Sequence, residues 1–168
     1  LRMLTPKQPT IRVLDVACGK GGDLTKFRRN DNIKHYVGVD VAQVSVEHAR
    51  ERYMSGRFPF KAEFYSGDAF GVPLAEVIPN KTIQVHLVSC QFALHYAFKS
   101  ERVCRQAVQN ISQSLTHDGI FICTVPNASV IRERVASGSA CNAHYRIEYT
   151  TAGQDKSTVY GQEYTFWL

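Results

Sequence analysis

The sequence contains no long apolar run, no Cys-x-x-Cys pair and no internal repeat. A membrane helix needs roughly 18 or more consecutive apolar residues, so we expect no membrane segment. The five cysteines and six histidines are scattered without metal-ligand spacing, so we expect no metal site. Unpaired thiols in this number are typical of a reducing compartment. The N-terminus lacks a signal-peptide pattern and begins with Leu1, so we expect a fragment of a longer polypeptide.

The composition indicates one globular domain with an uneven charge. Its 168 residues are 44% hydrophobic and 21% charged, which suits a single hydrophobic core. Residues 1–61 carry 12 Lys and Arg against 6 Asp and Glu, whereas residues 62–168 carry 8 against 9. We expect this excess positive charge to surround the first glycine turn and the next helix. It would attract a phosphate-bearing or nucleic-acid partner, or it could simply be a soluble basic surface.

A short strand followed by a glycine-rich turn organises the N-terminal third. Residues 11–16 form an apolar, β-branched run that predicts a buried strand. Residues 17–22, Ala-Cys-Gly-Lys-Gly-Gly, can turn tightly and let a ligand approach the backbone. A helix is predicted over residues 24–29, with Asp23 favourably placed at its N-terminus. This arrangement is typical of a nucleotide-binding βαβ unit, which dehydrogenases also use.

Alternating strands and helices follow, and they predict the fold class. One apolar stripe of Ala42, Val46, Ala49 and Tyr53 indicates a second helix. Another helix is predicted at 100–115, with Ser100 as its N-cap, before a turn at 116–119. We therefore expect an α/β fold with a doubly wound, mostly parallel Rossmann-like sheet, incomplete at its C-terminal end. The other predicted elements are strands at 36–40, 60–66, 82–90 and 120–125, a loop or short irregular helix at 72–80, a helix at 129–135, and strands at 145–150 and 163–168 around a loop at 151–158. The inner face expected for the 100–115 helix comprises Cys104, Ala107, Val108, Ile111 and Leu115.

Polar residues follow four consecutive predicted strands. The first is followed by a turn that ends at Asp23, and the second, third and fourth are followed by Asp40, Asp68 and residues 91–96. Ligands of open α/β sheets bind beyond the carboxyl ends of the strands, so we expect these groups at one edge. Asp40 lies 21 residues after Gly19, an interval that suits a ribose contact, and Asp68 could accept from an adenine amino group. Each aspartate alone could equally be a helix cap or a turn former.

The charge at the first turn bears on the choice of cofactor. A dinucleotide's pyrophosphate binds at a helix N-terminus that is free of negative charge. Asp23 occupies that position, and Asp15 is expected to add to the same negative patch. These carboxylates would repel a pyrophosphate but could pair with the ammonium group of S-adenosylmethionine. The residues therefore favour S-adenosylmethionine over a nicotinamide dinucleotide.

The chain also resembles the cellular messenger-RNA cap guanine-N7 methyltransferases. The resemblance begins at residues 13–24, Val-Leu-Asp-Val-Ala-Cys-Gly-Lys-Gly-Gly-Asp-Leu, and is most specific at residues 89–101, Ser-Cys-Gln-Phe-Ala-Leu-His-Tyr-Ala-Phe-Lys-Ser-Glu. Further matches are residues 39–46, 50–53, 119–122, 125–127 and Tyr164-x-Phe166-x-Leu168. The resemblance implies that residues 1–168 are one class I methyltransferase domain. The implied reaction is methyl transfer from S-adenosylmethionine to N7 of the cap guanine of messenger RNA.

The resemblance assigns site residues one by one. The residues implied to line the cofactor site are Ala17, Gly19, Asp23, Asp40, Asp68, Gln91 and Tyr96. The residues implied to face the cap are Lys20 and Arg52 at its phosphates, His95 and Tyr96 at the methylguanine pocket, and Pro126 against the guanine. Taken alone, Arg52 could be a solvated helix residue and His95 a turn residue before the Ser100 helix. No metal is implied.

The chain also departs from the family pattern. Ala17 stands where the family usually has glycine, and its methyl group is tolerable if φ is negative. Residues 141–145 follow the family's loop only loosely. The family's guanine-reading glutamate lies beyond the Tyr-x-Phe-x-Leu strand, and its N-terminal cap-binding segment has no counterpart here. We therefore expect a cofactor site with an incomplete cap pocket, and this fragment could be inactive.

The expected reaction requires no general base. Guanine N7 presents a lone pair and loses no proton when methylated, so His95 and Tyr96 are assigned to positioning rather than proton transfer. The alternatives are a small-molecule methyltransferase and a binding-only RNA-capping subunit. Capped RNA is the expected partner, with other capping-enzyme domains or an activating subunit beside it. A nuclear location is expected, or a cytoplasmic one for a viral or parasite-specific enzyme.

Overall fold

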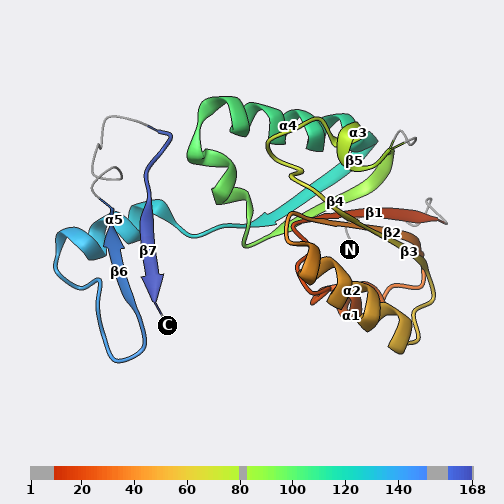
Figure 1. Ribbon diagram of the computed structural model, residues 1–168, viewed down its shortest axis with the longest axis horizontal. Coiled ribbons are helices and arrows are strands. Elements are labelled where there is room, and N and C mark those ends of the chain that lie inside the picture. Colours follow the sequence, from red (N-terminus) through yellow and green to blue (C-terminus); the bar gives the residue numbers. More distant parts are fainter. Residues whose placement is uncertain (1–9, 80–82, 151–158, 168) are drawn as a thin grey trace.

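The computed structural model describes residues 10–79, 83–150 and 159–167. Figure 1 shows a sheet with helices on both faces, connected to a smaller unit of one helix and two strands. Five parallel strands in the order β3-β2-β1-β4-β5 form the large sheet, which confirms the doubly wound α/β prediction. The strands are β1 (Ile11–Val16), β2 (Ile33–Asp40), β3 (Lys61–Ser66), β4 (Val85–Gln91) and β5 (Leu115–Thr124).

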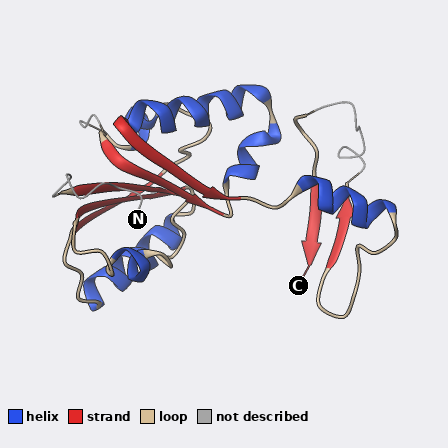
Figure 2. Ribbon diagram, turned by 180° about the vertical axis from the view of Figure 1, so that it is seen from behind, coloured by secondary structure: helices blue, strands red, loops and turns tan. Residues whose placement is uncertain are grey.

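The helices of the large unit cover both faces of this sheet (Figures 1 and 2). On one face lie α1 (Leu24–Phe27) and α2 (Gln43–Ser55), and on the other lie α3 (Leu74–Val77) and α4 (Glu101–Ser114). The strand order reverses between β1 and β4, because the chain winds outward from β1 in both directions. In open α/β sheets, such a switch point opens a crevice at the carboxyl ends of the strands. The fold therefore places the candidate site there.

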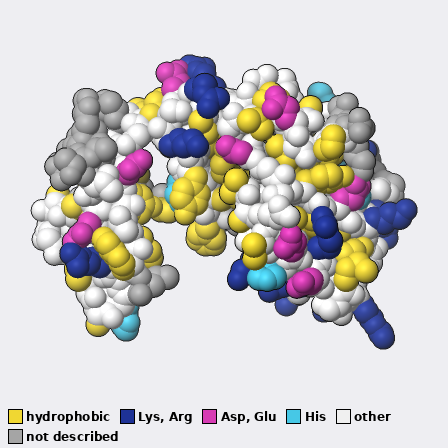
Figure 3. All heavy atoms as spheres, viewed as in Figure 1, with side chains coloured by type: hydrophobic (Ala, Val, Ile, Leu, Met, Phe, Trp, Pro, Cys, Tyr) yellow, Lys and Arg dark blue, Asp and Glu magenta, His cyan; other side chains and the backbone are white. Residues whose placement is uncertain are grey.

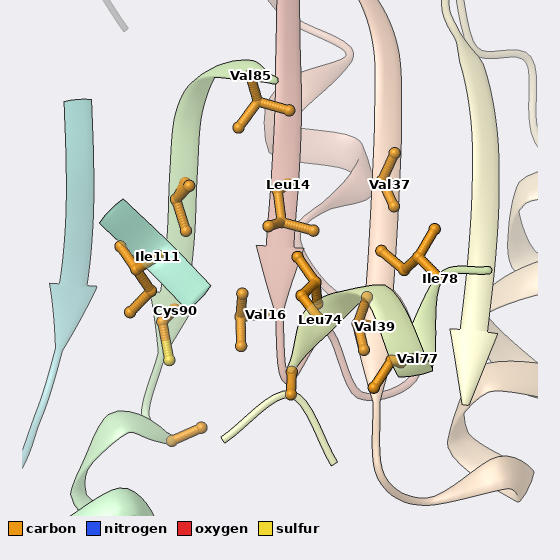
Figure 4. Close-up of a cluster of buried hydrophobic side chains, with 13 residues drawn as sticks. Leu14, Val16, Val37, Val39, Leu74, Val77, Ile78, Val85, Cys90 and Ile111 are labelled. Carbon is orange, nitrogen blue, oxygen red and sulfur yellow. The ribbon is translucent and has the colours of Figure 1, made fainter. Parts of the chain in front are cut away.

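Alternate strand residues build two cores, one on each face. Figure 4 shows the first, in which Leu14 and Val39 of the sheet meet Leu74 of α3 and Ile111 of α4. On the other face, Val13 and Tyr36 pack with side chains of α1 and α2. The three central strands β1, β2 and β4 thus bury residues on both faces, as expected for the centre of a parallel sheet. Burial of this apolar area stabilises the fold by about 25 cal/mol per Å².

The C-terminal strands do not join the large sheet. β6 (Arg146–Tyr149) and β7 (Tyr164–Trp167) form a separate two-stranded antiparallel sheet. They lie beside α5 (Ala128–Ala136), which buries none of its side chains (Figure 2). The predicted strands and helix are confirmed in type, but the parallel sheet ends at β5 within the described residues. The expected loop at 151–158 and the end of the last strand at Leu168 lie outside those residues.

Several boundaries differ from the predictions for physical reasons. The 3-10 helix η1 (Leu94–Lys99) precedes α4 and was not predicted, because its two short turns have no long apolar stripe. The predicted turn at 116–119 is instead a bulge within β5, where Val85 pairs with Leu115 and Leu87 pairs with Ile120. Asp118 takes a φ of +65° there, which an aspartate tolerates better than most residues.

The inner faces of the helices also differ in part. In α4, Val108 is 55% exposed and the buried positions are Val103, Ala107, Asn110, Ile111 and Ser114. The stripe predicted for α2 is confirmed at Val46 and Ala49, whereas Ala42 is exposed at the N-cap position. The Ser100 N-cap of α4 is confirmed, since its side chain accepts the backbone N–H of Val103.

Candidate cofactor and substrate site

The turn after β1 forms an open cradle at the carboxyl edge of the sheet. Gly19 and Gly21 take φ values of +52° and +70°, the left-handed region that favours glycine. An added Cβ at Gly19 or at Gly22 would meet no atom within 4 Å, so the turn leaves space beside its backbone. The sequence signal for close ligand approach therefore corresponds to an open backbone surface.

Ala17 corrects one expectation about this turn. Its φ is +58° rather than negative, so the alanine methyl group is held in a strained left-handed conformation. This conformation costs roughly 1–2 kcal/mol for an L-residue with a Cβ. Glycine would avoid that cost, which explains why a glycine suits this position.

Asp40 ties the end of β2 to the glycine turn. Its Oδ2 accepts the backbone N–H of Gly19 at 2.8 Å, and its Oδ1 accepts the N–H of Ala42 at 2.9 Å. Carboxylate oxygens have several acceptor sites, so both can still take a hydroxyl hydrogen from a ligand. Sequence spacing indicated a ribose contact for Asp40, and the structure adds a role in holding the turn.

Asp68 shapes the loop after β3. Its Oδ1 accepts the backbone N–H groups of Phe70 and Gly71, at 3.0 and 2.9 Å. A Cβ at residue 71 would lie 2.3 Å from Oδ2, so the close approach requires glycine. No described residue hydrogen-bonds Oδ2, which leaves this oxygen available at the sheet edge.

A buried asparagine supports the same loop and was not identified from the sequence. Asn110 of α4 donates to the carbonyls of Ala69 and Val72, both at 2.8 Å, and accepts the Leu74 N–H at 3.1 Å. It is only 6% exposed. The sequence did contain a signal for this role, because Asn110 falls on the same face of the predicted helix as buried Val103, Ala107 and Ile111. It was missed because amides usually lie on the outer face.

The two carboxylates near the first turn carry less free charge than predicted. Asp23 occupies the N-cap of α1 without a side-chain cap bond, and pairs with Lys26 at 2.6 Å. Asp15 is 2% exposed, and burial raises its pKa to about 7. A 2.7 Å hydrogen bond from the Tyr36 hydroxyl opposes that rise. The negative patch therefore depends on Asp23 and Asp40 more than on Asp15.

Gln91 ends β4 and is held by its neighbours. Its Nε2 donates to Oγ of Ser89 at 3.1 Å, and its Oε1 accepts from the Thr124 hydroxyl at 2.5 Å. The side chain is partly exposed. The predicted position at the carboxyl edge is found, but the amide is also used to join β4 to β5.

His95 and Tyr96 lie together on η1. Their ring centroids are 4.2 Å apart, and Tyr96 is 67% exposed. Nδ1 of His95 is buried without a hydrogen-bond partner among the described residues. Burial also lowers the His95 pKa, so the ring is held neutral at physiological pH. A neutral, half-buried imidazole suits positioning better than it suits charge compensation.

A notch separates the two units of the molecule (Figure 3). Pro126 lies on the connection between β5 and α5. Burial raises the pKa of Tyr164 in β7, and the charges of Tyr96 and Tyr149 add to that rise. The segment before β7 is hydrogen-bonded to η1, because the Gly161 N–H donates to the Phe98 carbonyl at 2.9 Å. Of the predicted cap residues, His95 and Tyr96 therefore lie on η1 near this hydrogen bond, and Pro126 lies on the connection between the two units.

The basic residues are distributed differently from the expectation. Lys20 is exposed on the glycine turn, and Arg52 is exposed near the end of α2. Arg52 lies in the last turn of α2, and Arg28, Arg29 and Arg57 follow the C-terminal ends of α1 and α2. In a parallel βαβ unit, helices run back against the strands, so these ends lie at the amino edge of the sheet. Much of the positive charge is thus on the edge opposite Asp40.

The described residues lack the features of a metal centre and of a membrane-spanning helix. No group of three His, Cys, Asp or Glu side chains there is arranged to hold a metal ion. No helix in those same ranges has the length and apolar content needed to cross a membrane. All five cysteines are free.

Comparison with known proteins identifies the family. The model of the mRNA (guanine-N(7))-methyltransferase domain matches residues 2–168. An mRNA cap guanine-N(7) methyltransferase of Cryptococcus neoformans is 39% identical over 96% of this chain and 27% of its own length. Proteins of the same name from Schizosaccharomyces pombe and Arabidopsis thaliana are 42% and 36% identical over 74% and 96% of this chain. The chain spans 34% and 47% of those two relatives.

Solved structures support the fold. Streptomyces venezuelae DesVI has a TM-score of 0.60 at 19% identity, covering 89% of this chain and 53% of its own. An S-adenosylmethionine-dependent methyltransferase from Clostridium acetobutylicum has a TM-score of 0.58 at 18% identity, covering 82% and 52%. At this identity the likeness concerns the fold alone. Because the family model covers nearly all of the sequence, the chain belongs to the mRNA (guanine-N7)-methyltransferase family.

Proposed function

We propose that the chain binds S-adenosylmethionine at the carboxyl edge of β1, β2 and β3 and takes part in methylating N7 of the cap guanine of messenger RNA. The observation that carries the proposal is the convergence of the open glycine turn, Asp40 and Asp68 at that edge. Family membership supports the reaction, and the chain spans about a quarter to a half of its relatives' length. The proposal therefore concerns the longer protein as well as this domain.

The cofactor residues fit an adenosine with a charged amino-acid tail. Asp40, held by Gly19, would accept the ribose hydroxyls. Asp68 would accept from the adenine amino group through Oδ2, since Oδ1 already serves the loop backbone. Asp23 would face the ammonium group, with Ala17, Gly19, Gln91 and Tyr96 lining the remaining space. S-adenosylmethionine supplies an electrophilic methyl group on a cationic sulfur.

The proposed cap residues orient the guanine and hold its phosphates. The acceptor N7 already has a lone pair, so no residue has to remove a proton. Neutral His95 and exposed Tyr96 would place the base, and Pro126 would pack against its face. Lys20 and Arg52 would contact different parts of the phosphate bridge, because Lys20 lies on the glycine turn and Arg52 lies in the last turn of α2. Neither has an ion-pair partner among the described residues. Positioning of this kind can account for a large share of the reduction in the activation barrier for methyl transfer.

Capped RNA is the proposed substrate. We also propose a nuclear location, with other capping domains or an activating subunit as partners, because the named relatives from fungi and plants are messenger-RNA cap enzymes. A cytoplasmic location would apply to a viral or parasite-specific protein.

The deciding experiment compares ligand binding by matched variants. Calorimetry with S-adenosylmethionine should give a saturable signal, whereas a binding-only RNA subunit would give none. Arg52→Ala should weaken binding of a capped oligonucleotide at physiological salt, and Arg29→Ala, an exposed arginine after α1 that the proposal does not assign to the cap, should not. Unchanged cap affinity in Arg52→Ala would refute its assignment. Methyl transfer by the longer protein to a metabolite, but not to a cap dinucleotide, would establish a small-molecule methyltransferase instead.

A further inference from the structure

An open cavity of about 560 Å³ lies where α2 meets β3. Its walls come from the last turn of α2 and the loop that follows, and they are Tyr53, Met54, Gly56, Arg57, Phe58 and Pro59. Since α2 runs back from the carboxyl end of β2 to the start of β3, this cavity lies at the amino edge. It is therefore separate from the proposed cofactor site, although its wall residue Tyr53 directly follows Arg52, a proposed cap residue, in the last turn of α2.

The aromatic wall of the cavity is rigid. Tyr53 and Phe58 stack with centroids 5.4 Å apart at 18°, and the Tyr53 hydroxyl donates to the Phe60 carbonyl at 2.7 Å. A Cβ at residue 56 would lie 2.3 Å from Phe58, so glycine is required for this ring position. A preformed wall reduces the conformational entropy that the protein loses when a ligand binds.

The rim combines an exposed apolar side chain with unpaired cations. Met54 is 76% exposed, and Arg57 is exposed beside it. The Arg28 guanidinium lies 5.9 Å from the centre of the Phe58 ring. Within the described ranges, neither Arg28 nor Arg57 has a carboxylate within ion-pair distance, in contrast to Lys26. The cavity thus offers an apolar floor beside uncompensated positive charge.

These features distinguish between two classes of acidic ligand. A single-stranded nucleic acid would need a free aromatic face for base stacking. Tyr53 covers one side of Phe58 and Arg28 lies over the ring as well, so a base finds little free face. A peptide needs only a pocket for one side chain and cations for its carboxylates. Methionine and arginine are also enriched in protein interfaces.

We propose that this cavity is a docking site for an acidic peptide segment of a partner protein. One leucine-sized side chain of the segment enters between Met54 and Phe58. Its flanking carboxylates pair with Arg57 and Arg28. The contact is at the opposite edge from Asp40, so the partner can bind while the carboxyl edge is occupied.

Fluorescence anisotropy of a labelled peptide, with Asp and Glu around one central Leu, tests this proposal. Saturable binding that weakens with salt is expected, with at least about tenfold loss in Arg57→Glu and in Met54→Glu. Replacing the peptide's Leu by Ala should cause a similar loss. Arg105→Glu on α4 is the matched charge control and should bind normally. Retained S-adenosylmethionine binding in each variant shows that the fold is intact.

Three results would overturn the docking site. The first is no peptide binding by the unaltered chain. The second is peptide binding that Arg57→Glu and Met54→Glu leave unchanged. The third is binding of a labelled uridine oligonucleotide of equal length in preference to the peptide. Failure of S-adenosylmethionine binding by the unaltered chain would instead count against the proposed function alone.

Discussion

The backbone N–H of Gly19 donates to Oδ2 of Asp40 at 2.8 Å, joining the first turn of the fold to the end of β2. The other carboxylate oxygen accepts the Ala42 N–H at the start of α2. One side chain therefore holds a turn, fixes the backbone just before α2 and presents acceptors at the sheet edge. Its substitution should affect ligand binding through both direct contact and loop position.

Asp40→Ala should weaken S-adenosylmethionine binding by about tenfold to a hundredfold, or 1.4–2.8 kcal/mol. Asp40→Asn keeps one acceptor for Ala42 but places an N–H₂ group against the Gly19 N–H, so it should also bind weakly. Calorimetry measures both. Asp31→Ala, an exposed aspartate after α1, is the control and should bind like the unaltered chain. Equal affinity in all three variants would contradict the assignment of Asp40.

Asp15 should make stability depend on pH. Its folded-state pKa of about 7 lies above the ordinary aspartate pKa of 3.8, so the folded chain binds an extra proton between these pH values. Stability from this group is therefore present at low pH and lost as pH rises from about 4 to 7. The loss should be on the order of a few kcal/mol, measured by urea unfolding at successive pH values.

Asp15→Asn tests the origin of that dependence. The amide oxygen can still accept from the Tyr36 hydroxyl, but the side chain no longer titrates. The stability of this variant should change less between pH 5 and 7 than that of the unaltered chain. The same slope in both proteins would assign the effect to other groups.

Ala17→Gly should stabilise the chain. Relief of the left-handed alanine conformation at φ +58° gains roughly 1–2 kcal/mol, and the greater freedom of glycine when unfolded costs about 0.5–1 kcal/mol. A net gain of up to about 1 kcal/mol in the free energy of unfolding should result. Ala75→Gly, at an exposed position in α3, should instead destabilise. Destabilisation by both changes would show that Ala17 is unstrained.

Asn110→Leu should destabilise the chain by about 2–4 kcal/mol. The change leaves the Leu74 N–H and the carbonyls of Ala69 and Val72 without their partner. Hydrogen exchange should accelerate first at Leu74. Gln106→Leu removes a single bond to Asn110 at a half-buried position and should cost much less. Similar losses in both variants would indicate a general effect of α4 rather than loss of the loop support.

Local patterns were enough to predict the elements that carry the proposed cofactor site. β1 was located correctly, because an apolar run met a glycine turn, and Asp40 was placed by its distance from Gly19. Parallel topology then brought Asp40 and Asp68 to one edge. These predictions succeeded because each depends on residues close together in sequence and on the regular way in which a helix connects two parallel strands.

Features that depend on distant partners were not predictable in this way. Alternation identified β6 and β7 as strands, but it could not show that they pair with each other outside the parallel sheet. The contacts of Asn110 join residues 36 to 41 positions apart. Arg28 and Arg57 belong to the basic N-terminal third that was expected to surround the glycine turn, yet the reversal of direction in each helix carries them to the amino edge.

The bulge at residues 116–119 has a consequence for solubility. β5 is the last strand of the parallel sheet within the described residues, so one row of its backbone N–H and carbonyl groups faces outward. His117 and Asp118, with side chains 97% and 80% exposed, project from the first half of that strand and interrupt its register. A strand from a neighbouring molecule could pair without interruption only along Ile120 to Thr124. The irregular register and the charged side chain on edge strand β5 thus limit the pairing of sheets between molecules.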